Sequence, residues 1–340
     1  MPIYTPRNVL ITGGAGFIGC HFVRYLLGAD PHVRLIDLDM LTYAGSLDNL
    51  KELPDPDRHT VVPGNICDRA LVEYLLREHA IDTIVHFAAE SHVDRSITGP
   101  AAFIQTNVVG TFTLLEAARA IWLHEKAWDA SRCRFHHIST DEVYGTLEPH
   151  DPPFCETTPY APNSPYAASK AASDHLVRAY HRTYGLPTSM THCSNNYGPY
   201  QHDEKFIPTI IRACLGGQPI PVYGDGSNRR DWLYVNDHCA AIDTVIRHGR
   251  VGQTYNIGGG DDWKNLDVVS VICQILADLT GASVETFSRL ICFVTDRPGH
   301  DWRYAIDATR LQDELNWQPS ETFETGMRKT VAWYMTKYTL

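Results

Sequence analysis

Three regularly spaced glycines near the start of the chain follow directly on a short β-rich run, Asn8 to Thr12. They stand ahead of a helical stretch from Cys20 to Leu27. In a nucleotide-binding strand-turn-helix unit, one glycine makes the turn, one lets the backbone approach a pyrophosphate, and one lets the helix pack closely. The pattern predicts a Rossmann-type α/β fold with a doubly wound parallel sheet. The cofactor contacts expected in this turn are Gly13, Gly16, Phe17, Ile18 and Gly19.

An acidic residue follows the second predicted strand, Val33 to Leu38. Asp39 lies 20 residues beyond Gly19, where a carboxylate accepts hydrogen bonds from an adenosine ribose and repels a 2′-phosphate. NAD is therefore expected rather than NADP. Asp37 alternates onto the same face and competes for this role, and Asp39 is preferred because it is nearer the end of the strand.

Two later runs are predicted as strands that end in loops facing the cofactor. The run from Thr60 to Asp68 lies where the adenine pocket is expected, with Asn65 and Ile66 at its edge. A strand from Thr83 to Phe87 leads into a polar loop that should line the inner half of the cofactor and the substrate. A solvated loop is the alternative, because loops are usually polar and exposed. The contacts predicted in the second loop are Ala88 and Ser91.

Three polar side chains, Thr140, Asp141 and Glu142, follow a predicted buried strand from Arg134 to Ser139. Ligands of open α/β sheets bind at the carboxyl ends of the strands, so these side chains are expected to reach the crevice. Two adjacent carboxyls there can divide acid and base duties. The alternative is that Thr140 and Asp141 merely cap a following helix.

Tyr166 and Lys170 are four residues apart in a predicted helix and therefore share one face. In reductases of this pattern the ammonium lowers the pKa of the phenol and holds the ribose, and the phenolate takes a proton from an alcohol. The spacing is common by chance. Together with the glycine turn and the polar strand end it predicts an oxidoreductase site.

The overall composition narrows the classes of partner. Lys and Arg total 29 against 40 Asp and Glu, a formal net charge of −11, which argues against general binding of nucleic acid or anionic membranes. The nine cysteines lack a C-x-x-C pair, so neither a metal site nor disulfides are expected and a reducing cytoplasm fits best. No run approaches the roughly 18 apolar residues of a membrane span.

A helix predicted over Asn107 to Ile121 is apolar on more than one face and must be covered twice. The helix that carries Tyr166 also presents small and apolar residues. Paired across a two-fold axis, the two helices would make a four-helix contact, so a homodimer is expected. The residues of the second helix in this contact are Ala168, Ala172, Leu176 and Ala179.

The chain resembles the extended short-chain dehydrogenase/reductase family in TGGAGFIG (12–19), HFAAESHVDRS (86–96) and YAASK (166–170). Within that family it resembles the dTDP-glucose 4,6-dehydratases in STDEVYG (139–145), CSNNYGPY (193–200), RDWLYV (230–235), YNIGG (255–259) and DRPGHD (296–301). The resemblance spans nearly the whole chain. It departs from the family at Met40, where a basic residue is usual, at Asn65, where an Asp is usual, and at His192, where an Asn is usual.

The resemblance implies an NAD-binding Rossmann domain over residues 1–198, with a return segment at about 229–258. It also implies a smaller C-terminal α/β domain over 199–228 and 259–340 that grips the nucleotide of the substrate. Within these segments, 232–246 is predicted as a helix returning to the Rossmann domain, 255–258 as its last strand and 267–279 as a helix of the smaller domain.

The resemblance also implies a set of substrate contacts. Of these, Tyr223 is suited to stack on a base, and Arg230 and Arg297 to clamp a diphosphate. The full set is Ser91, Thr140, Asn195, Asn196, Glu204, Lys205, Tyr223, Arg230, Asn265, Arg297 and His300.

The expected reaction is conversion of dTDP-glucose to dTDP-4-keto-6-deoxyglucose and water. Tyr166, Thr140 and Lys170 serve oxidation at C4, Glu142 removes the C5 proton, and Asp141 protonates the departing C6 hydroxyl. The choice of thymidine over uridine follows from the resemblance alone. Two alternatives are a sugar-nucleotide 4-epimerase, which needs no carboxyl pair, and a non-enzymatic NAD-sensing protein.

Overall fold

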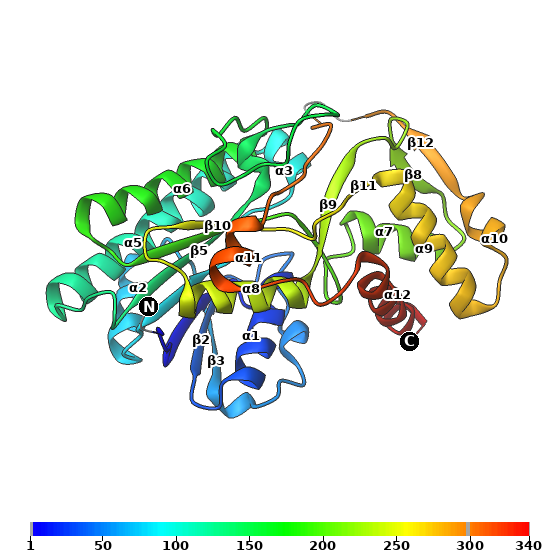
Figure 1. Ribbon diagram of the computed structural model, residues 1–340. Helices are drawn as coiled ribbons and strands as arrows, with labels where there is room; N and C mark the ends of the chain where they lie inside the picture. The colour runs from blue at the N-terminus through cyan, green and yellow to red at the C-terminus, as the bar shows by residue number, and fades with distance from the viewer. Residues whose placement is uncertain (1–2, 297–299, 340) are drawn as a thin grey trace.

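The computed structural model describes residues 3–296 and 300–339. Its centre is a seven-stranded sheet in the order β3-β2-β1-β4-β5-β6-β10 (Figure 1), and each neighbouring pair of strands is parallel. This confirms the predicted Rossmann-type fold. The strands are β1 (Asn8–Thr12), β2 (Arg34–Asp39), β3 (His59–Pro63), β4 (Thr83–His86), β5 (Arg134–Thr140), β6 (Thr188–Cys193) and β10 (Thr254–Ile257).

Helices cover both faces of this sheet because its strands are apolar on both sides. Val9 and Ile11 of β1 pack in one core with α1, α8 and α11, whereas Leu10 packs in another with α2, α5 and α6. The sheet is therefore buried on both faces, as a doubly wound fold requires. The helices are α1 (Phe17–Ala29), α2 (Arg69–Glu78), α5 (Thr111–Ala118), α6 (Pro165–Tyr184), α8 (Val235–His248) and α11 (Thr309–Leu315).

The helix predicted over Asn107 to Ile121 is present within a longer helical run. This run begins with α4 (Pro100–Phe103) and continues through π-helical turns at Ile104–Gly110 into α5, and then through a second π-helical segment, Arg119–Glu125. The sequence did not reveal the π-helical segments, because they keep an almost helical periodicity.

A smaller lobe follows the large sheet and has a core of its own. It contains a three-stranded sheet, β11-β9-β7, and a parallel pair, β12-β8. Figure 1 shows this lobe on the right, with α9 and α12 packed beside these strands. Its elements are β7 (Asn195–Tyr197), α7 (Phe206–Leu215), β8 (Ile220–Tyr223), β9 (Arg229–Tyr234), β11 (Asp262–Lys264), α9 (Asn265–Thr280), α10 (Val284–Ser288), β12 (Ile291–Val294) and α12 (Phe323–Thr339).

One predicted element needs correction. The helix expected over 232–246 begins only at Val235, because Trp232 to Tyr234 belong to β9, which pairs with β7 and β11. The expected last strand and the helix at 267–279 are present as β10 and α9. The domain boundaries at 198, 228 and 258 stay a prediction. Within the described ranges, no helix is long and apolar enough to cross a membrane.

Candidate active site

The turn between β1 and α1 requires glycine at two of the predicted positions. Gly13 has φ +79°, and a β-carbon there would lie 2.8 Å from the backbone nitrogen of Ala88. A β-carbon on Gly19 would collide with the carbonyl oxygen of Gly13. Gly16 is the N-cap of α1 and offers no side chain to the first turn. No side chain caps the first turn of α1, so the N-terminus of this helix is suited to an anion such as a pyrophosphate.

Asp39 is the better of the two candidates for a ribose contact. Its carboxylate accepts hydrogen bonds from the backbone of Ala15 (3.0 Å) and Leu41 (2.7 Å) and keeps 8% exposure at the end of β2. Asp37 is fully buried and accepts a bond from the backbone nitrogen of Gly14 at 2.9 Å. Both carboxylates thus hold the glycine turn, and only Asp39 keeps part of its surface exposed.

Asn65 and Ile66 lie in the turn after β3, at the edge expected for adenine. Asn65 is exposed and its Oδ1 accepts a hydrogen bond from the backbone of Cys67 at 2.9 Å. Ile66 is buried at 5% exposure and packs in the core with α2 and α5. A polar and an apolar group side by side are suited to the edge and the face of a base.

The polar strand end of β5 combines a cap with a buried acid. Thr140 Oγ1 accepts a hydrogen bond from the backbone of Glu142 at 3.3 Å, so the predicted capping role is real, and the cap opens a short 3-10 turn, Asp141–Tyr144. Asp141 is 2% exposed, and its Oδ2 has no hydrogen-bond partner among the described residues. Glu142 beside it is half-buried. A buried carboxyl oxygen without a partner marks a site where a ligand group is expected.

The surroundings of Asp141 shift the pKa of its carboxyl group. Burial and the charges of Glu142 and Asp231 raise the pKa of Asp141 well above the usual range of a carboxyl group, although the charge of Arg230 opposes them. These surroundings favour the protonated form of Asp141, the form that a general acid requires.

Tyr166 is buried on α6. Burial and the charge of Glu142 raise the pKa of this phenol well above its usual value, and the nearby hydroxyl of Thr140 only partly opposes them. Lys170 donates from Nζ to the carbonyl oxygen of Ile138 at 2.7 Å. The expected lowering of the Tyr166 pKa by Lys170 stays a prediction, since Lys170 is not among the groups that shift this pKa here.

A buried network beneath Lys170 was not predicted. Asp174 on α6 lies 3.2 Å from Nε2 of His137 and 3.1 Å from Nε2 of His192, and accepts a hydrogen bond from Ser139 at 2.8 Å. Burial alone would raise the pKa of Asp174, but the bonds from the two histidines hold it well below its usual range. The unusual residue His192 thus ties β6 to α6 through Asp174, and His137 does the same for β5.

A third carboxyl, Asp231 of β9, was also missed. It is 2% exposed, and its Oδ1 accepts a hydrogen bond from the backbone of Gly259 at 2.7 Å. Burial raises its pKa to about 6, against the hydrogen bond from the backbone of Gly259. A carboxyl residue directly ahead of Trp232 and Leu233, within one strand, is the signal in the sequence that could have revealed it.

Arg230, which precedes Asp231, lies beside the acid pair. Its guanidinium donates to the backbone oxygen of Asp301 at 2.8 Å, and its central carbon lies 4.3 Å from the centre of the Tyr304 ring. Its charge lowers the pKa of Asp141. Arg230 is therefore close enough to the predicted catalytic residues to contact a substrate that they hold.

Two of the predicted substrate residues in the smaller lobe lie together. The rings of Tyr223, which is 40% exposed, and His300 meet edge-on with centroids 6.0 Å apart, and His300 Nδ1 lies 2.6 Å from Asp296 Oδ1. Asn265 is buried at the start of α9. Arg297 lies outside the described residues.

The two adjacent asparagines of β7 differ in availability. Asn195 Oδ1 is buried and has no hydrogen-bond partner within residues 3–296 and 300–339. The amide of Asn196 already bonds to His238 (2.8 Å) and to the backbone of Ser194 (3.0 Å). Asn195 is therefore the better placed of the two for a ligand. Across the crevice, Lys205 donates to the backbone oxygen of Ser91 at 3.2 Å.

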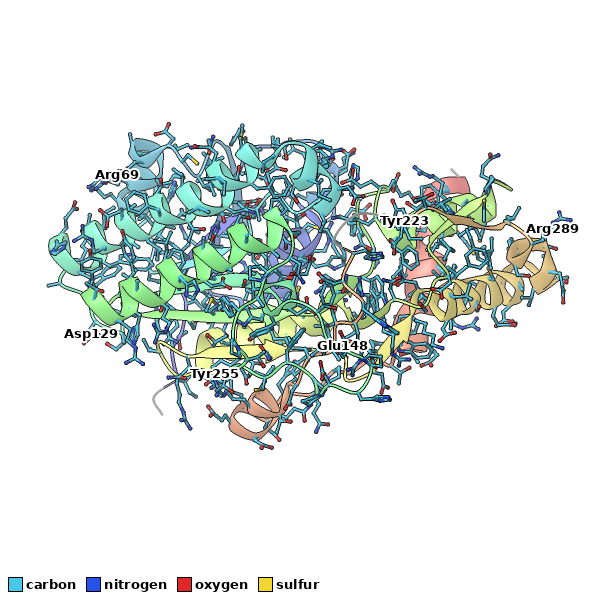
Figure 2. All side chains as sticks on the ribbon, turned by 90° about the horizontal axis from the view of Figure 1, so that it is seen from above. Arg69, Asp129, Glu148, Tyr223, Tyr255 and Arg289 are labelled. Carbon is cyan, nitrogen blue, oxygen red and sulfur yellow. The ribbon has the colours of Figure 1, made fainter. Side chains whose placement is uncertain are left out.

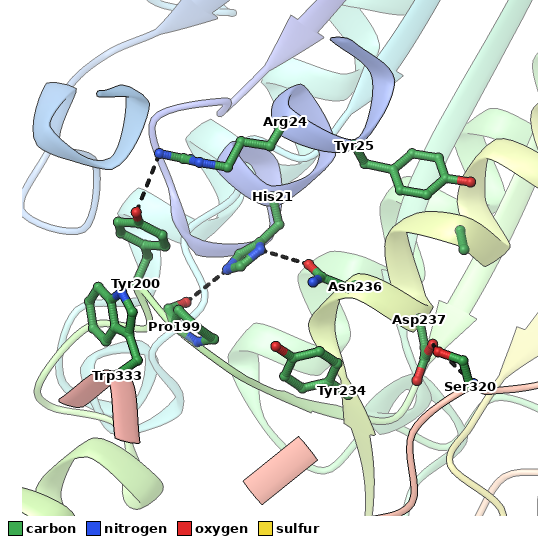
Figure 3. Close-up of a pocket in the computed structure, with 11 residues that line it drawn as sticks. His21, Arg24, Tyr25, Pro199, Tyr200, Tyr234, Asn236, Asp237, Ser320 and Trp333 are labelled. Atoms are coloured by element: carbon green, nitrogen blue, oxygen red, sulfur yellow. Dashed lines mark hydrogen bonds between the residues drawn. The ribbon is translucent and has the colours of Figure 1, made fainter. Parts of the chain in front are cut away.

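A separate pocket lies between α1, α8 and α12 and holds none of the predicted site residues (Figure 3). His21 lies 2.9 Å from both Asn236 Oδ1 and the backbone oxygen of Pro199, and the rings of Tyr200 and Trp333 lie 4.7 Å apart. Burial lowers the pKa of His21 to about 4. The neutral imidazole joins α1 to α8 and to the loop that enters the smaller lobe.

Known proteins similar to this chain include curated relatives named dTDP-glucose 4,6-dehydratase. A family model described as GDP-mannose 4,6 dehydratase matches residues 10–330. A protein of Xanthomonas campestris pv. campestris (strain B100) named dTDP-glucose 4,6-dehydratase is 57% identical over 97% of this chain and 93% of its own. The protein of the same name from Neisseria meningitidis serogroup B is 54% identical, again over 97% and 93%.

Solved structures extend the similarity to the fold. The dTDP-glucose 4,6-dehydratase of Streptomyces venezuelae, solved with NAD bound, matches with a TM-score of 0.87 at 47% identity over 98% of both chains. The UDP-glucose 4-epimerase of Thermotoga maritima matches with a TM-score of 0.85 at 26% identity over 97% of this chain and 99% of its own. The chain therefore belongs to the dTDP-glucose 4,6-dehydratases, within the extended short-chain dehydrogenase/reductase family.

Proposed function

We propose that this protein is an NAD-dependent dTDP-glucose 4,6-dehydratase, which forms dTDP-4-keto-6-deoxyglucose and water. The observation that carries the proposal is the carboxyl pair Asp141–Glu142 at the end of β5, next to Tyr166 and Lys170 on α6. A 4-epimerase needs hydride and proton transfer at C4 alone, without removal of the C5 proton or loss of the C6 hydroxyl, and has no use for this pair. The relatives at 54–57% identity, named for the same reaction, support the proposal.

The cofactor site fits NAD. The turn at Gly13 and Gly19 has no room for side chains, the N-terminus of α1 is uncapped by any side chain, and Asp39 faces the turn with a carboxylate that suits a ribose diol and repels a 2′-phosphate. NAD, when bound, supplies a reversible hydride acceptor. The remaining chemistry is proton transfer by side chains of this protein.

Those proton transfers are divided among three groups. Tyr166, with the hydroxyl of Thr140 nearby, takes the proton of the C4 hydroxyl. The C4 ketone acidifies C5, and Glu142 removes the C5 proton. Asp141, protonated because burial and neighbouring charges raise its pKa, gives its proton to the departing C6 hydroxyl. Lys170 supports the strand end by its bond to Ile138.

The substrate nucleotide is proposed to bind between β9 and the smaller lobe. Arg230 lies beside the acid pair, and Tyr223 offers a partly exposed ring for a base. The remaining proposed contacts are Ser91, Asn195, Asn196, Glu204, Lys205, Asn265, Arg297 and His300.

A homodimer is part of the proposal. Figure 2 shows α5 and α6 running side by side along one edge of the molecule, and these helices also contact one another. Ile104 (50% exposed), Val109 (36%) and Phe112 (45%) present apolar surface on the first helical run, and Ala168 and Ala179 are exposed on α6. A second copy of the same face would cover this surface. All nine cysteines are free, which supports a cytoplasmic location.

Mass spectrometry after incubation of the purified protein with NAD and dTDP-glucose tests the proposed function. Loss of one water from the sugar nucleotide is the expected result. A change of configuration at constant mass would instead indicate a 4-epimerase, and an unchanged substrate would indicate a protein that only binds NAD.

A further inference from the structure

Three segments meet above the glycine turn through the side chains of Tyr43, Arg95 and Glu204. Tyr43 lies in the loop after β2, Arg95 in α3 (Val93–Thr98) after β4, and Glu204 in the loop that leads into α7. The central carbon of the Arg95 guanidinium lies 3.6 Å from the centre of the Tyr43 ring, and Arg95 Nη2 donates to Glu204 Oε2 at 3.0 Å.

The strand order places this contact over the cofactor crevice. β2 and β4 pair with β1 on opposite sides, and the glycine turn leaves the carboxyl end of β1. A contact between the loops after β2 and β4 therefore crosses the end of β1. A dinucleotide that runs from Asp39, after β2, to Lys170, on the helix beyond β5, must also cross that end.

We propose that Tyr43, Arg95 and Glu204 belong to the cofactor-binding machinery and form a strap that closes over bound NAD and slows its release. The inference rests on the proposed function, because it requires that the glycine turn hold NAD. The strap joins the large sheet to the loop entering the smaller lobe, and Lys205 adds a second link through its bond to the backbone of Ser91.

The strap acts on the dissociation of NAD from the protein rather than on its association. The contact must break for a dinucleotide beneath it to leave, so its energy adds to the barrier for dissociation. An exposed ion pair alone contributes little, and Arg95 keeps 49% of its side chain exposed. The guanidinium here also lies against an aromatic ring, and the carboxylate is only 20% exposed, so the contacts reinforce one another.

The test is the rate at which NADH leaves the full-length protein. The protein is loaded with NADH and mixed with a large excess of NAD, and the loss of bound-NADH fluorescence is followed in the parent, Arg95→Gln and Tyr43→Leu. Each variant is expected to release NADH roughly 5- to 30-fold faster than the parent, the range for loss of a cation–π contact with an ion pair. The double variant should be no faster than the faster single one, because both changes break one contact.

Arg77→Gln is the matched control, because Arg77 pairs with Glu125 at 2.6 Å and is 45% exposed, but stands on α2. It should release NADH at the parental rate. Thermal unfolding identifies any variant that is not folded, and the other single variant then carries the test. If the folded strap variants release NADH at the rate of the parent, the strap is overturned and the proposed function is not. If the parent protein itself binds no NADH, both the strap and the proposed function are overturned.

Discussion

Asp141 and Glu142 are neighbours with different surroundings, and that difference supports their separate roles. Asp141 is almost fully buried with an oxygen that lacks a partner in the described part of the chain, whereas Glu142 is half-buried. Burial disfavours the charged form of a carboxyl, and a second negative charge nearby disfavours it further. Proton donor and proton acceptor can therefore coexist on consecutive residues.

The pH dependence of turnover should report the protonation of Asp141. This acid works only while protonated, so activity should be present below its raised pKa and fall as pH rises through that value, above the range of an ordinary carboxyl. Asp231→Asn removes one of the charges that raise this pKa, and should move the alkaline fall of kcat to lower pH. Asp278→Asn, an exposed change on α9, should leave the profile in place. An unmoved alkaline limb in Asp231→Asn would contradict the assignment of Asp141.

At the scale of single elements, the turn into α1 depends on the space around its glycines. Gly19 packs against the carbonyl oxygen of Gly13, so the first turn of α1 can approach β1 only without a β-carbon. Gly28, near the end of the same helix, is exposed, and a methyl group added there would meet no atom within contact distance. The two positions form a matched pair.

Gly19→Ala should destabilise the protein by about 1–3 kcal/mol, because the added methyl group overpacks the turn. It should also weaken NAD binding, because α1 then moves away from β1. Gly28→Ala should instead stabilise the protein by about 0.5–1 kcal/mol, since alanine loses less backbone entropy than glycine in a helix. Urea unfolding of the two variants measures both effects, and equal unfolding midpoints would count against the close packing of this turn.

The elements that the sequence predicted best are those with local signals. The glycine turn, the strand before it and the helix after it appear together in one short continuous stretch, and so does the polar end of β5. β9 was mistaken for the start of a helix because its pairing partners, β7 and β11, come from distant parts of the chain. Asp231 and the network around Asp174 were missed for the same reason. Their burial and partners depend on tertiary contacts that no short motif encodes.

At the scale of the whole molecule, the exposed apolar surface of the α5–α6 edge predicts self-association. Phe112→Glu places a charge in the centre of this surface and should convert the dimer to a monomer, because an unpaired charge is costly to bury. Sedimentation velocity measures the change. Phe293→Glu, at a similarly exposed position of β12 in the smaller lobe, should remain dimeric. A parent that sediments as a monomer would contradict the proposed assembly.

The complete reaction should need no net oxidant, because the reducing equivalent taken at C4 is used at C6. Turnover should therefore continue with NAD far below the concentration of product formed. Steady accumulation of NADH in proportion to product would contradict this redox cycle.

In the proposed mechanism, oxidation at C4 and elimination across C5 and C6 use different side chains. Single-turnover mixing of NAD-loaded protein with dTDP-glucose, with NADH absorbance and product followed together, separates the two steps. Glu142→Gln should form NADH yet lose roughly 10²- to 10⁴-fold in product formation, the range for a positioned proton-transfer group. Tyr166→Phe should form little NADH at all. Parental product formation by Glu142→Gln, or parental NADH formation by Tyr166→Phe, would contradict the roles assigned to these residues.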